Sequence, residues 1–536
     1  MKLTPDLILF NGRLHTLDEN YAHATALAVA GQKILAIGND REILALAGPG
    51  TQIRDLETRR VLPGFWDAHF HFYEWALNYG GIDFARTVDF QGMETALNDK
   101  ASQLGPGQWV LGQGFNESEW PENKMPDRHD LDRAAPHNPV CIWRCDLHLA
   151  VANSRALELA GIHQNTPDPE GGVIVRDGAG FPNGILKEMA PDLIRLAMPP
   201  LSESTLMDNM EKAMVHAHGL GLTSVHDIRL MGGREGADAL GLWQAVQGAG
   251  KLNLRCHVAL PGEMTDQAVA LGLRSGFGND RLIIGYLKFF ADGGMGARTA
   301  WMTQPYLDAE FGMPLTPVKE IESAVIKADQ AGLACMVHAI GDRACQEIIQ
   351  MFSRVEQANQ SRCLIPHRLE HAQMVLPQDL VHLSRLKNLA ISCQPNNLSL
   401  DISMIDQCAG ARGQYAYALK SLMNTGLPLM LSSDAPVADP NPFAGIYSAV
   451  TRKRMNRTPA LGWYPEQALS VEEAVRAYTL TPARVSGCGP VLGSLTPGKL
   501  ADLVVIDQDI FKIPLEEIAH TQVVLTLFDG KIVHER

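Results

Sequence analysis

The sequence predicts an α/β protein whose main body is a (β/α)8 TIM barrel, and three observations lead to this prediction. Short apolar stretches alternate with helical stretches through the middle of the chain, a pattern typical of βαβ units in a parallel sheet. Eight of these apolar stretches are predicted strands. Both ends of the chain carry short strands separated by turn dipeptides, which favours a small β-sandwich domain beside the barrel.

Composition limits the classes of function. The chain has 536 residues, enough for a large domain and a smaller one, and its net charge of −14 with no basic run argues against nucleic acid and anionic membranes as partners. A small-molecule substrate is therefore expected. Nine cysteines without a C-x-x-C pair fit free thiols. No stretch resembles a signal peptide or approaches the length of a membrane span, so we expect a cytoplasmic protein. The sequence leaves open whether the protein forms a homodimer.

The β-sandwich is expected to combine both ends of the chain, residues 1–58 and 491–536, with the barrel over 59–490 between them. Turn dipeptides such as Asn11-Gly12 and Asp529-Gly530 separate its predicted strands. These strands are 6–10, 13–17, 26–30, 33–38 and 52–55 near the N-terminus, and 499–507, 523–528 and 531–534 near the C-terminus.

The first barrel strand is predicted over residues 61–72, VLPGFWDAHFHF. Its C-terminal part carries Asp67, His69 and His71, spaced two apart, and side chains with this spacing share one face of a strand. Two neighbouring imidazoles can bind one divalent metal through a ring nitrogen each. This stretch alone is equally compatible with two polar residues leaving a strand, so the evidence must come from the rest of the chain.

The other seven barrel strands follow a long interval. Residues of about 77–200 exceed one crossover and are predicted to form an inserted subdomain over the barrel mouth, with a strand at 140–145, a helix at 153–160 and a hairpin at 171–183. A substrate lid is expected there, with structural padding as the alternative. The later strands are 222–227, 254–260, 286–292, 334–340, 367–371, 389–394 and 429–434, and helices include 206–218, 320–331, 343–357 and 416–425.

Six polar residues lie at the C-terminal ends of five predicted strands, where the chemistry of such barrels is located. Each histidine alone could be a core residue, and the aspartate could cap a turn. A lysine inside an apolar strand is harder to explain structurally, because a buried unpaired ammonium is costly. Together they make a complete ligand set for a pair of divalent metals. The six residues are His69, His71, Lys288, His338, His371 and Asp434.

These motifs resemble the amidohydrolase superfamily, and more narrowly its YtcJ-like branch, amidohydrolase family 3, which includes N-substituted formamide deformylases. The similarity rests on VLPGFWDAHFH, RCDLHLAVANSRAL, LKFFADGG, HAIGDRA, RLEHAQ and SSDAP, which occur in this order. It covers essentially the whole chain.

The resemblance implies a role for each residue. His69, His71 and Asp434 would bind the more buried metal, and His338 and His371 the more exposed one. Lys288 would be carbamylated and bridge two metals, with zinc as the expected metal. A bridging hydroxide would attack the substrate carbonyl, with Asp434 as the catalytic residue that moves its proton to the leaving amine.

Further residues are candidates for contacts with ligands or substrate. Asp67 shares the face of His69, and His148 follows the strand of the inserted subdomain. The others lie at the ends of strands or in the loops that follow. Each of these candidates could instead have a purely structural role. These are His226, Asp292, Arg298 and Asp342.

We therefore expect a metal-dependent hydrolase that cleaves a carbon–nitrogen bond, an amide or N-substituted formamide, of a small organic molecule. One alternative is a mononuclear deaminase of the same superfamily, which would have no use for Lys288 as a bridge. Another is a non-catalytic scaffold, although no predicted ligand is missing.

Overall fold

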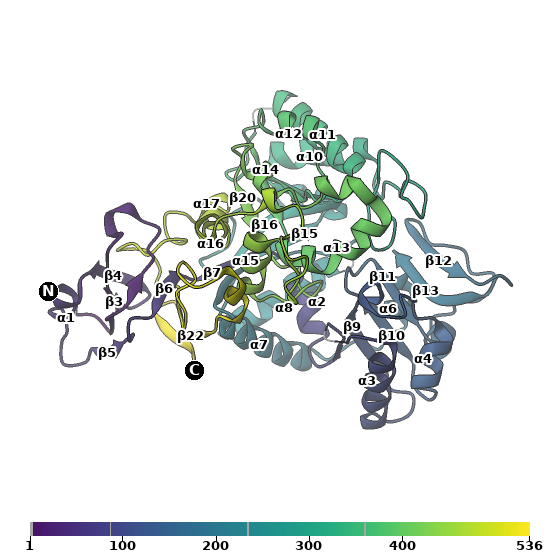
Figure 1. The fold of residues 1–536 in the computed structure, drawn as a ribbon, viewed down its shortest axis with the longest axis horizontal. Helices are drawn as coiled ribbons and strands as arrows, with labels where there is room; N and C mark the ends of the chain where they lie inside the picture. The colour runs from purple at the N-terminus through teal and green to yellow at the C-terminus, as the bar shows by residue number, and fades with distance from the viewer. Residues whose placement is uncertain (1–3, 86, 233–234, 359–360) are drawn as a thin grey trace.

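The computed structural model describes residues 4–85, 87–232, 235–358 and 361–536 and confirms the predicted fold class. Figure 1 shows the sheets of the two termini on one side of a central barrel and the inserted sheet on the other. The barrel is an eight-stranded parallel sheet. Its strands, in order, are β7 (Phe65–Phe70), β14 (Leu222–Asp227), β15 (Arg255–Pro261), β16 (Leu282–Phe290), β17 (Ala334–Ala339), β18 (His367–His371), β19 (Leu389–Cys393) and β20 (Leu429–Leu431).

The first and last segments of the barrel are joined next to the predicted site. The Asp434 amide donates to the His69 carbonyl at 2.8 Å, and the His71 amide donates to the Ala435 carbonyl at 2.8 Å. The strands are almost wholly buried because side chains fill the barrel and helices cover its outside. The backbone pairing therefore fixes the relative positions of three predicted ligands.

The predicted strand 61–72 is two strands in the structure. β6 (Arg60–Pro63) pairs with β21 (Leu503–Ile506) of a terminal sheet, and β7 belongs to the barrel. Gly64 lies between them, and a Cβ atom there would lie 2.3 Å from Thr223 Oγ1. The chain can pass this closely from the terminal sheet into the barrel only because residue 64 has no side chain.

Two sheets contain the strands of the chain ends, as predicted. A four-stranded sheet is formed by β4, β3, β1 and β5, and a five-stranded sheet by β2, β6, β21, β22 and β23. Apolar side chains from both ends pack together, including Leu9, Leu27 and Leu503. The boundaries 1–58, 59–490 and 491–536 stay a prediction. The remaining strands are β1 (Leu7–Phe10), β2 (Arg13–Leu14), β3 (Ala26–Ala30), β4 (Lys33–Gly38), β5 (Gln52–Asp55), β22 (Val523–Phe528) and β23 (Lys531–Glu535).

The inserted segment has a six-stranded sheet of its own, ordered β12, β13, β11, β10, β9 and β8. Its helices pack on this sheet, and separate apolar clusters fill the space between them. The sequence indicated β10 and the hairpin but missed β8, β9 and β11. Its elements are β8 (Ile82–Asp83), α3 (Phe90–Gln103), β9 (Val110–Phe115), α4 (Arg128–Ala134), β10 (Val140–Arg144), β11 (Leu149–Ala152), α5 (Ser154–Leu159), β12 (Gly172–Arg176), β13 (Pro182–Glu188) and α6 (Pro191–Ala197).

Helices between the barrel strands surround the barrel (Figure 1). Among the described residues, no helix has the length and apolar character needed to cross a membrane. The main helices are α2 (Phe72–Leu77), α7 (Glu203–Gly219), α8 (Glu235–Gly248), α9 (Thr265–Ala270), α10 (Val318–Ala331), α11 (Asp342–Ala358), α12 (Pro377–Leu383), α13 (Pro395–Ala409), α14 (Leu419–Met423), α15 (Pro442–Thr451), α16 (Val471–Ala477) and α17 (Leu480–Val485), with α1 (Asp40–Leu44) in the N-terminal part.

Candidate metal centre

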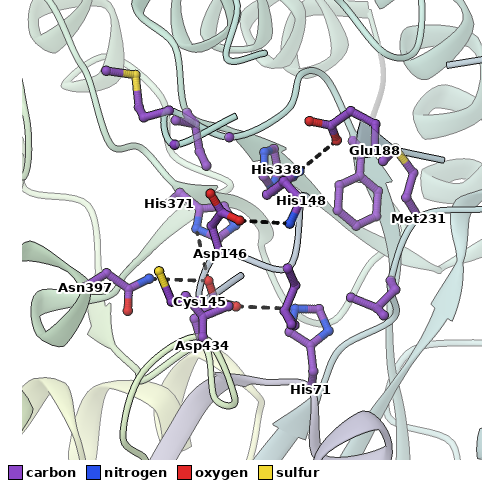
Figure 2. A pocket seen from close by; sticks show the side chains of 18 of the residues that line it. His71, Cys145, Asp146, His148, Glu188, Met231, His338, His371, Asn397 and Asp434 are labelled. Atoms are coloured by element: carbon purple, nitrogen blue, oxygen red, sulfur yellow. Dashed lines mark hydrogen bonds and ion pairs between the residues drawn. The ribbon is translucent and has the colours of Figure 1, made fainter. Parts of the chain in front are cut away.

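The barrel brings the six residues predicted as metal ligands together at its mouth. Figure 2 shows His71, His338, His371 and Asp434 around one pocket, which Lys288 also lines. His69 lies beside them, with its ring centroid 5.4 Å from that of His71 and 4.8 Å from that of His371. One ligand atom from each of His69, His371 and Asp434 lies within 4.8 Å of the other two. These three residues alone can hold one metal ion.

In each of three imidazoles, a hydrogen bond occupies one ring nitrogen and leaves the other free for a metal. His69 Nδ1 contacts Glu370 Oε2, His371 Nδ1 lies 3.0 Å from Gln394 Oε1, and His338 Nε2 lies 3.4 Å from the Gly293 carbonyl. Each oxygen accepts a proton from the ring, so the second ring nitrogen carries the lone pair. Metal-binding histidines have this arrangement, with one N–H donated to an oxygen.

Several buried polar atoms at the mouth have no hydrogen-bond partner among the described residues. These atoms are His69 Nε2, His71 Nδ1, Lys288 Nζ and Asp434 Oδ1. Leaving such groups buried and unsatisfied is costly. Asp434 Oδ1 lies 3.3 Å from both His69 Nε2 and His71 Nε2, so a bound cation would satisfy atoms that the protein itself leaves unpaired. The residues present fit a metal.

Burial keeps the imidazoles in the neutral form that binds metals. Desolvation, followed by the charges of neighbouring groups such as Lys288, lowers the pKa of His69 and His371 well below its usual value. The pKa of His338 is lowered in the same way, first by burial and then by His371. Burial also lowers the pKa of Lys288 to about 8, which increases the fraction of neutral amine near neutral pH. Its Nζ lies 4.6 Å from the Phe290 ring centroid.

Two of these predicted ligands have an unusual backbone. His371 has φ of 66° and Asp434 has φ of 62°, both in the left-handed region that residues with a side chain rarely adopt. Such strain persists only where the surrounding structure maintains it, and it is concentrated at functional sites. This conformation occurs at the last residue of β18, His371, and three residues after the end of β20, at Asp434, and both residues line the pocket.

Glu370 is a residue of the site that the sequence analysis missed. It is fully buried, and besides contacting His69 it accepts from Arg368 Nε at 2.7 Å and from Arg368 Nη2 at 2.9 Å. Arg368 Nη2 also donates to the Ala68 carbonyl. The carboxylate therefore fixes the His69 ring, and the guanidinium fixes the carboxylate.

Glu370→Gln should weaken metal binding about 10- to 100-fold, the usual effect of losing such a supporting group. A glutamine oxygen cannot serve both His69 and Arg368 as a carboxylate does, so the His69 ring loses its fixed orientation. Competition with a chelator measures the affinity. Asp502→Asn is the matched control, because Asp502 is a buried carboxylate that accepts from Arg255 at 2.7 Å far from the mouth. Equal metal affinity in Glu370→Gln and wild type would show that Glu370 has no such role.

The structure also places the acidic candidates. Asp67 accepts from the His69 amide at 3.1 Å and from Ser433 Oγ at 2.5 Å, so its contacts are with the backbone and a hydroxyl rather than with an imidazole. Asp292 accepts three backbone amides of the loops beside His338, at 2.8 to 3.0 Å. Asp342, the first residue of α11, accepts hydrogen bonds from the amide and the hydroxyl of Thr303. Burial raises the pKa of Asp67 and of Asp292 to about 7.

Two other candidates lie outside the residues lining the pocket. His226 is buried in the barrel, where its Nδ1 accepts from Trp66 Nε1 at 3.2 Å and its Nε2 contacts Ser486 Oγ at 3.0 Å. Arg298 pairs with Asp308 at 2.7 Å in the loop after β16. Its guanidinium is therefore already occupied by a carboxylate.

His148 does line the pocket. It comes from the turn between β10 and β11, and its ring centroid lies 5.4 Å from that of His338. Burial is the largest single effect and lowers the pKa of His148, but the charge and hydrogen bond of Glu188, whose Oε2 lies 2.7 Å from His148 Nδ1, act together with the charges of Asp146 and Asp434 and raise this pKa to about 9. The inserted subdomain therefore forms part of the wall of the site.

A second group of metal-binding residue types consists of Asp329, Cys363 and His367. The Cys335 amide donates to His367 Nδ1 at 3.0 Å, so in the neutral ring Nε2 carries the proton. This nitrogen lies 3.3 Å from Asp329 Oδ1, and because it carries the proton it has no lone pair to offer a metal. The mouth is therefore the better candidate.

Comparison with known proteins places this site in a family. A model described as amidohydrolase family matches residues 52–534. The chain belongs to the amidohydrolase family. This amidohydrolase is 30% identical to the putative amidohydrolase YtcJ of Bacillus subtilis (strain 168), with 99% of each chain covered. It is 27% identical to the N-substituted formamide deformylase of Arthrobacter pascens, covering 99% of this chain and 98% of the relative.

A solved structure is similar over nearly the whole amidohydrolase chain. It is an uncharacterized metal-dependent hydrolase from Pyrococcus horikoshii OT3, with a TM-score of 0.74 and 27% identity over 95% of this chain and 99% of that one. The family and the metal-dependent hydrolases among the similar proteins support a hydrolase that uses metal.

Proposed function

We propose that this amidohydrolase hydrolyses a carbon–nitrogen bond, in an amide or N-substituted formamide of a small organic molecule. The observation that carries the proposal is the convergence of all six predicted ligand residues at the barrel mouth, with unpaired atoms on four of them. A non-catalytic scaffold would have no need to keep this costly arrangement.

The walls of the pocket support a substrate with an apolar substituent. Carbon-rich and sulfur-containing side chains from the barrel and from the inserted subdomain surround the polar centre. Methionine side chains are flexible and can pack against apolar substituents of different shapes. The residues are Leu147, Met189, Leu230, Met231, Phe290, Met295 and Ile340.

The polar residues have separate tasks in this proposal. Two divalent metals, for which we propose zinc, would be held by His69, His71, His338, His371, Asp434 and a carbamate of Lys288. When bound, such metals supply a water of lowered pKa and polarise the substrate carbonyl. Asp434 accepts the proton of the attacking water and passes it to the leaving amine. Asn397 Nδ2 lies 3.5 Å from Asp434 Oδ2 and orients the carboxylate.

The test is elemental analysis of protein purified without chelator, together with hydrolysis assays on a series of N-substituted formamides and matched amides. We expect about two divalent ions per chain and release of amine from at least one series, lost on chelation and restored by metal. Metal-loaded protein that releases ammonia from an aminated heterocycle but hydrolyses no amide would favour the deaminase. Protein that binds no metal would contradict both.

A further inference from the structure

A chain of three side chains links the barrel to the inserted subdomain at the mouth. His148 Nδ1 lies 2.7 Å from Glu188 Oε2, and Thr299 Oγ1 donates to Glu188 Oε1. Glu188 is the last residue of β13 in the inserted sheet, and His148 lies in the turn between β10 and β11 of the same sheet. Thr299 lies in the loop after β16, the strand that carries Lys288. Figure 2 shows Glu188 and His148 beside His338.

Thr299 itself is held by the same barrel loop. Its hydroxyl oxygen accepts from the Gly294 amide at 3.0 Å while the hydroxyl proton is donated to Glu188. Each carboxylate oxygen of Glu188 therefore has one partner, one on the barrel and one on the imidazole. Because the carboxylate can only accept, His148 Nδ1 carries a proton and the ring orientation is fixed.

Two glycines make this contact feasible. A Cβ at Gly293 would lie 2.4 Å from Glu188 Oε1, and one at Gly294 would lie 2.8 Å from His148 Cδ2. Glu188 also has φ of 53°, in the left-handed region. The ADGG segment after Lys288 is thus shaped to receive two side chains from the inserted subdomain, and strained backbone directs one of them there.

The start of the His148 turn is fixed as well. The His148 amide donates to Asp146 Oδ1 at 3.1 Å, and Asp146 Oδ2 accepts from the buried Arg144 at 2.7 Å. The backbone and Nδ1 of His148 are therefore both held, and the rest of the ring borders the pocket next to His338.

We propose that Glu188 and Thr299 are positioning residues for substrate binding: through them the barrel loop holds His148 of the inserted subdomain beside His338, facing the substrate in the pocket. The inference rests on the proposed function for the identity of the substrate. Its structural part, the dependence of the His148 ring on Thr299, stands apart from that function and can be measured without turnover.

The experiment compares Thr299→Val, which removes the hydroxyl at constant shape, with Thr299→Ser, which keeps it. Thr299→Val should lower kcat/KM about tenfold, mainly through KM, with metal content unchanged, because one hydrogen bond of the chain is lost. Thr299→Ser should restore most of the loss. Thr51→Val is the matched control, since Thr51 also accepts from a glycine amide, Gly48, and donates to a carbonyl, but in the N-terminal part.

Two further measurements separate positioning from a general structural effect. In protein with isotope-labelled histidine, the hydrogen-bonded imidazole N–H signal that disappears in His148→Gln should shift in Thr299→Val and stay in Thr299→Ser. In the His148→Gln background, Thr299→Val should change kcat/KM by less than about twofold, because the imidazole that Thr299 positions through Glu188 is already absent.

The failures of the two proposals differ. If wild-type enzyme hydrolyses no amide, the proposed function is wrong, and the imidazole signal still decides the inference. An unchanged signal in Thr299→Val would overturn it. A full tenfold loss from Thr299→Val on top of His148→Gln would also overturn it, because Thr299 would then act by another route.

Discussion

His71→Ala should lose most of its bound metal and lower kcat by more than about a thousandfold, while the barrel stays folded. The His71 ring has no hydrogen-bond partner for Nδ1 among the described residues, and its Nε2 lies 3.3 Å from Asp434 Oδ1. The imidazole therefore contributes to the mouth of the barrel rather than to hydrogen bonds that hold the fold. His69→Ala should have the same effect on metal, with some loss of stability because Glu370 loses its imidazole partner. Elemental analysis and circular dichroism measure both.

His257→Gln is the control for this experiment. His257 is a buried barrel histidine whose Nε2 contacts Cys488 Sγ at 3.7 Å, and it does not line the pocket. It should keep full metal content in the folded protein. Full metal content and normal turnover in His71→Ala would remove His71 from the site.

The sequence was sufficient to predict which six residues meet at the mouth because of how parallel barrels are built. A histidine, lysine or aspartate at the C-terminal end of any strand reaches the same mouth, so residues 300 or more positions apart could be grouped without knowing a single contact. Lys288 was the most informative of them, because an ammonium in an apolar strand has few structural explanations.

Glu370 could not be predicted in the same way. It precedes His371 on β18, and neighbouring residues on a strand point to opposite faces, so only one of them was expected at the site. The left-handed backbone of His371 ends this alternation and lets both residues serve the mouth. A local distortion of this kind has no periodic signature.

Glu188 and Thr299 were missed for another reason. They lie 40 and 151 positions from His148, on different parts of the fold, and meet only when the inserted subdomain packs on the loop after β16. The glycines of ADGG were a visible signal, but their meaning depends on which side chains approach them. Similarly, the break at Gly64 depends on Thr223, which is far away in the chain.

Lys288→Arg should lose one or both metals and most of the activity. A lysine must be neutral to react with carbon dioxide, and burial, which lowers the pKa of Lys288 to about 8, makes the neutral amine available. The resulting carbamate is an anion that two cations would hold. A guanidinium stays protonated and cannot be carbamylated, so arginine adds a positive charge where a bridging anion is required. Elemental analysis, turnover and intact mass after gentle handling are the measurements.

Lys288→Ala provides the complementary test of the bridge. It leaves a gap at the end of β16 without adding charge, so a small carboxylic acid in excess should enter the gap and partly restore both metal content and turnover. The same acid should not rescue Lys288→Arg, because the guanidinium still fills the position. If Lys288→Arg instead keeps two metals and near-normal turnover, Lys288 does not bridge them. Retention of a single metal with turnover of an aminated substrate would favour the mononuclear deaminase, which needs the imidazoles and Asp434 but no bridging group.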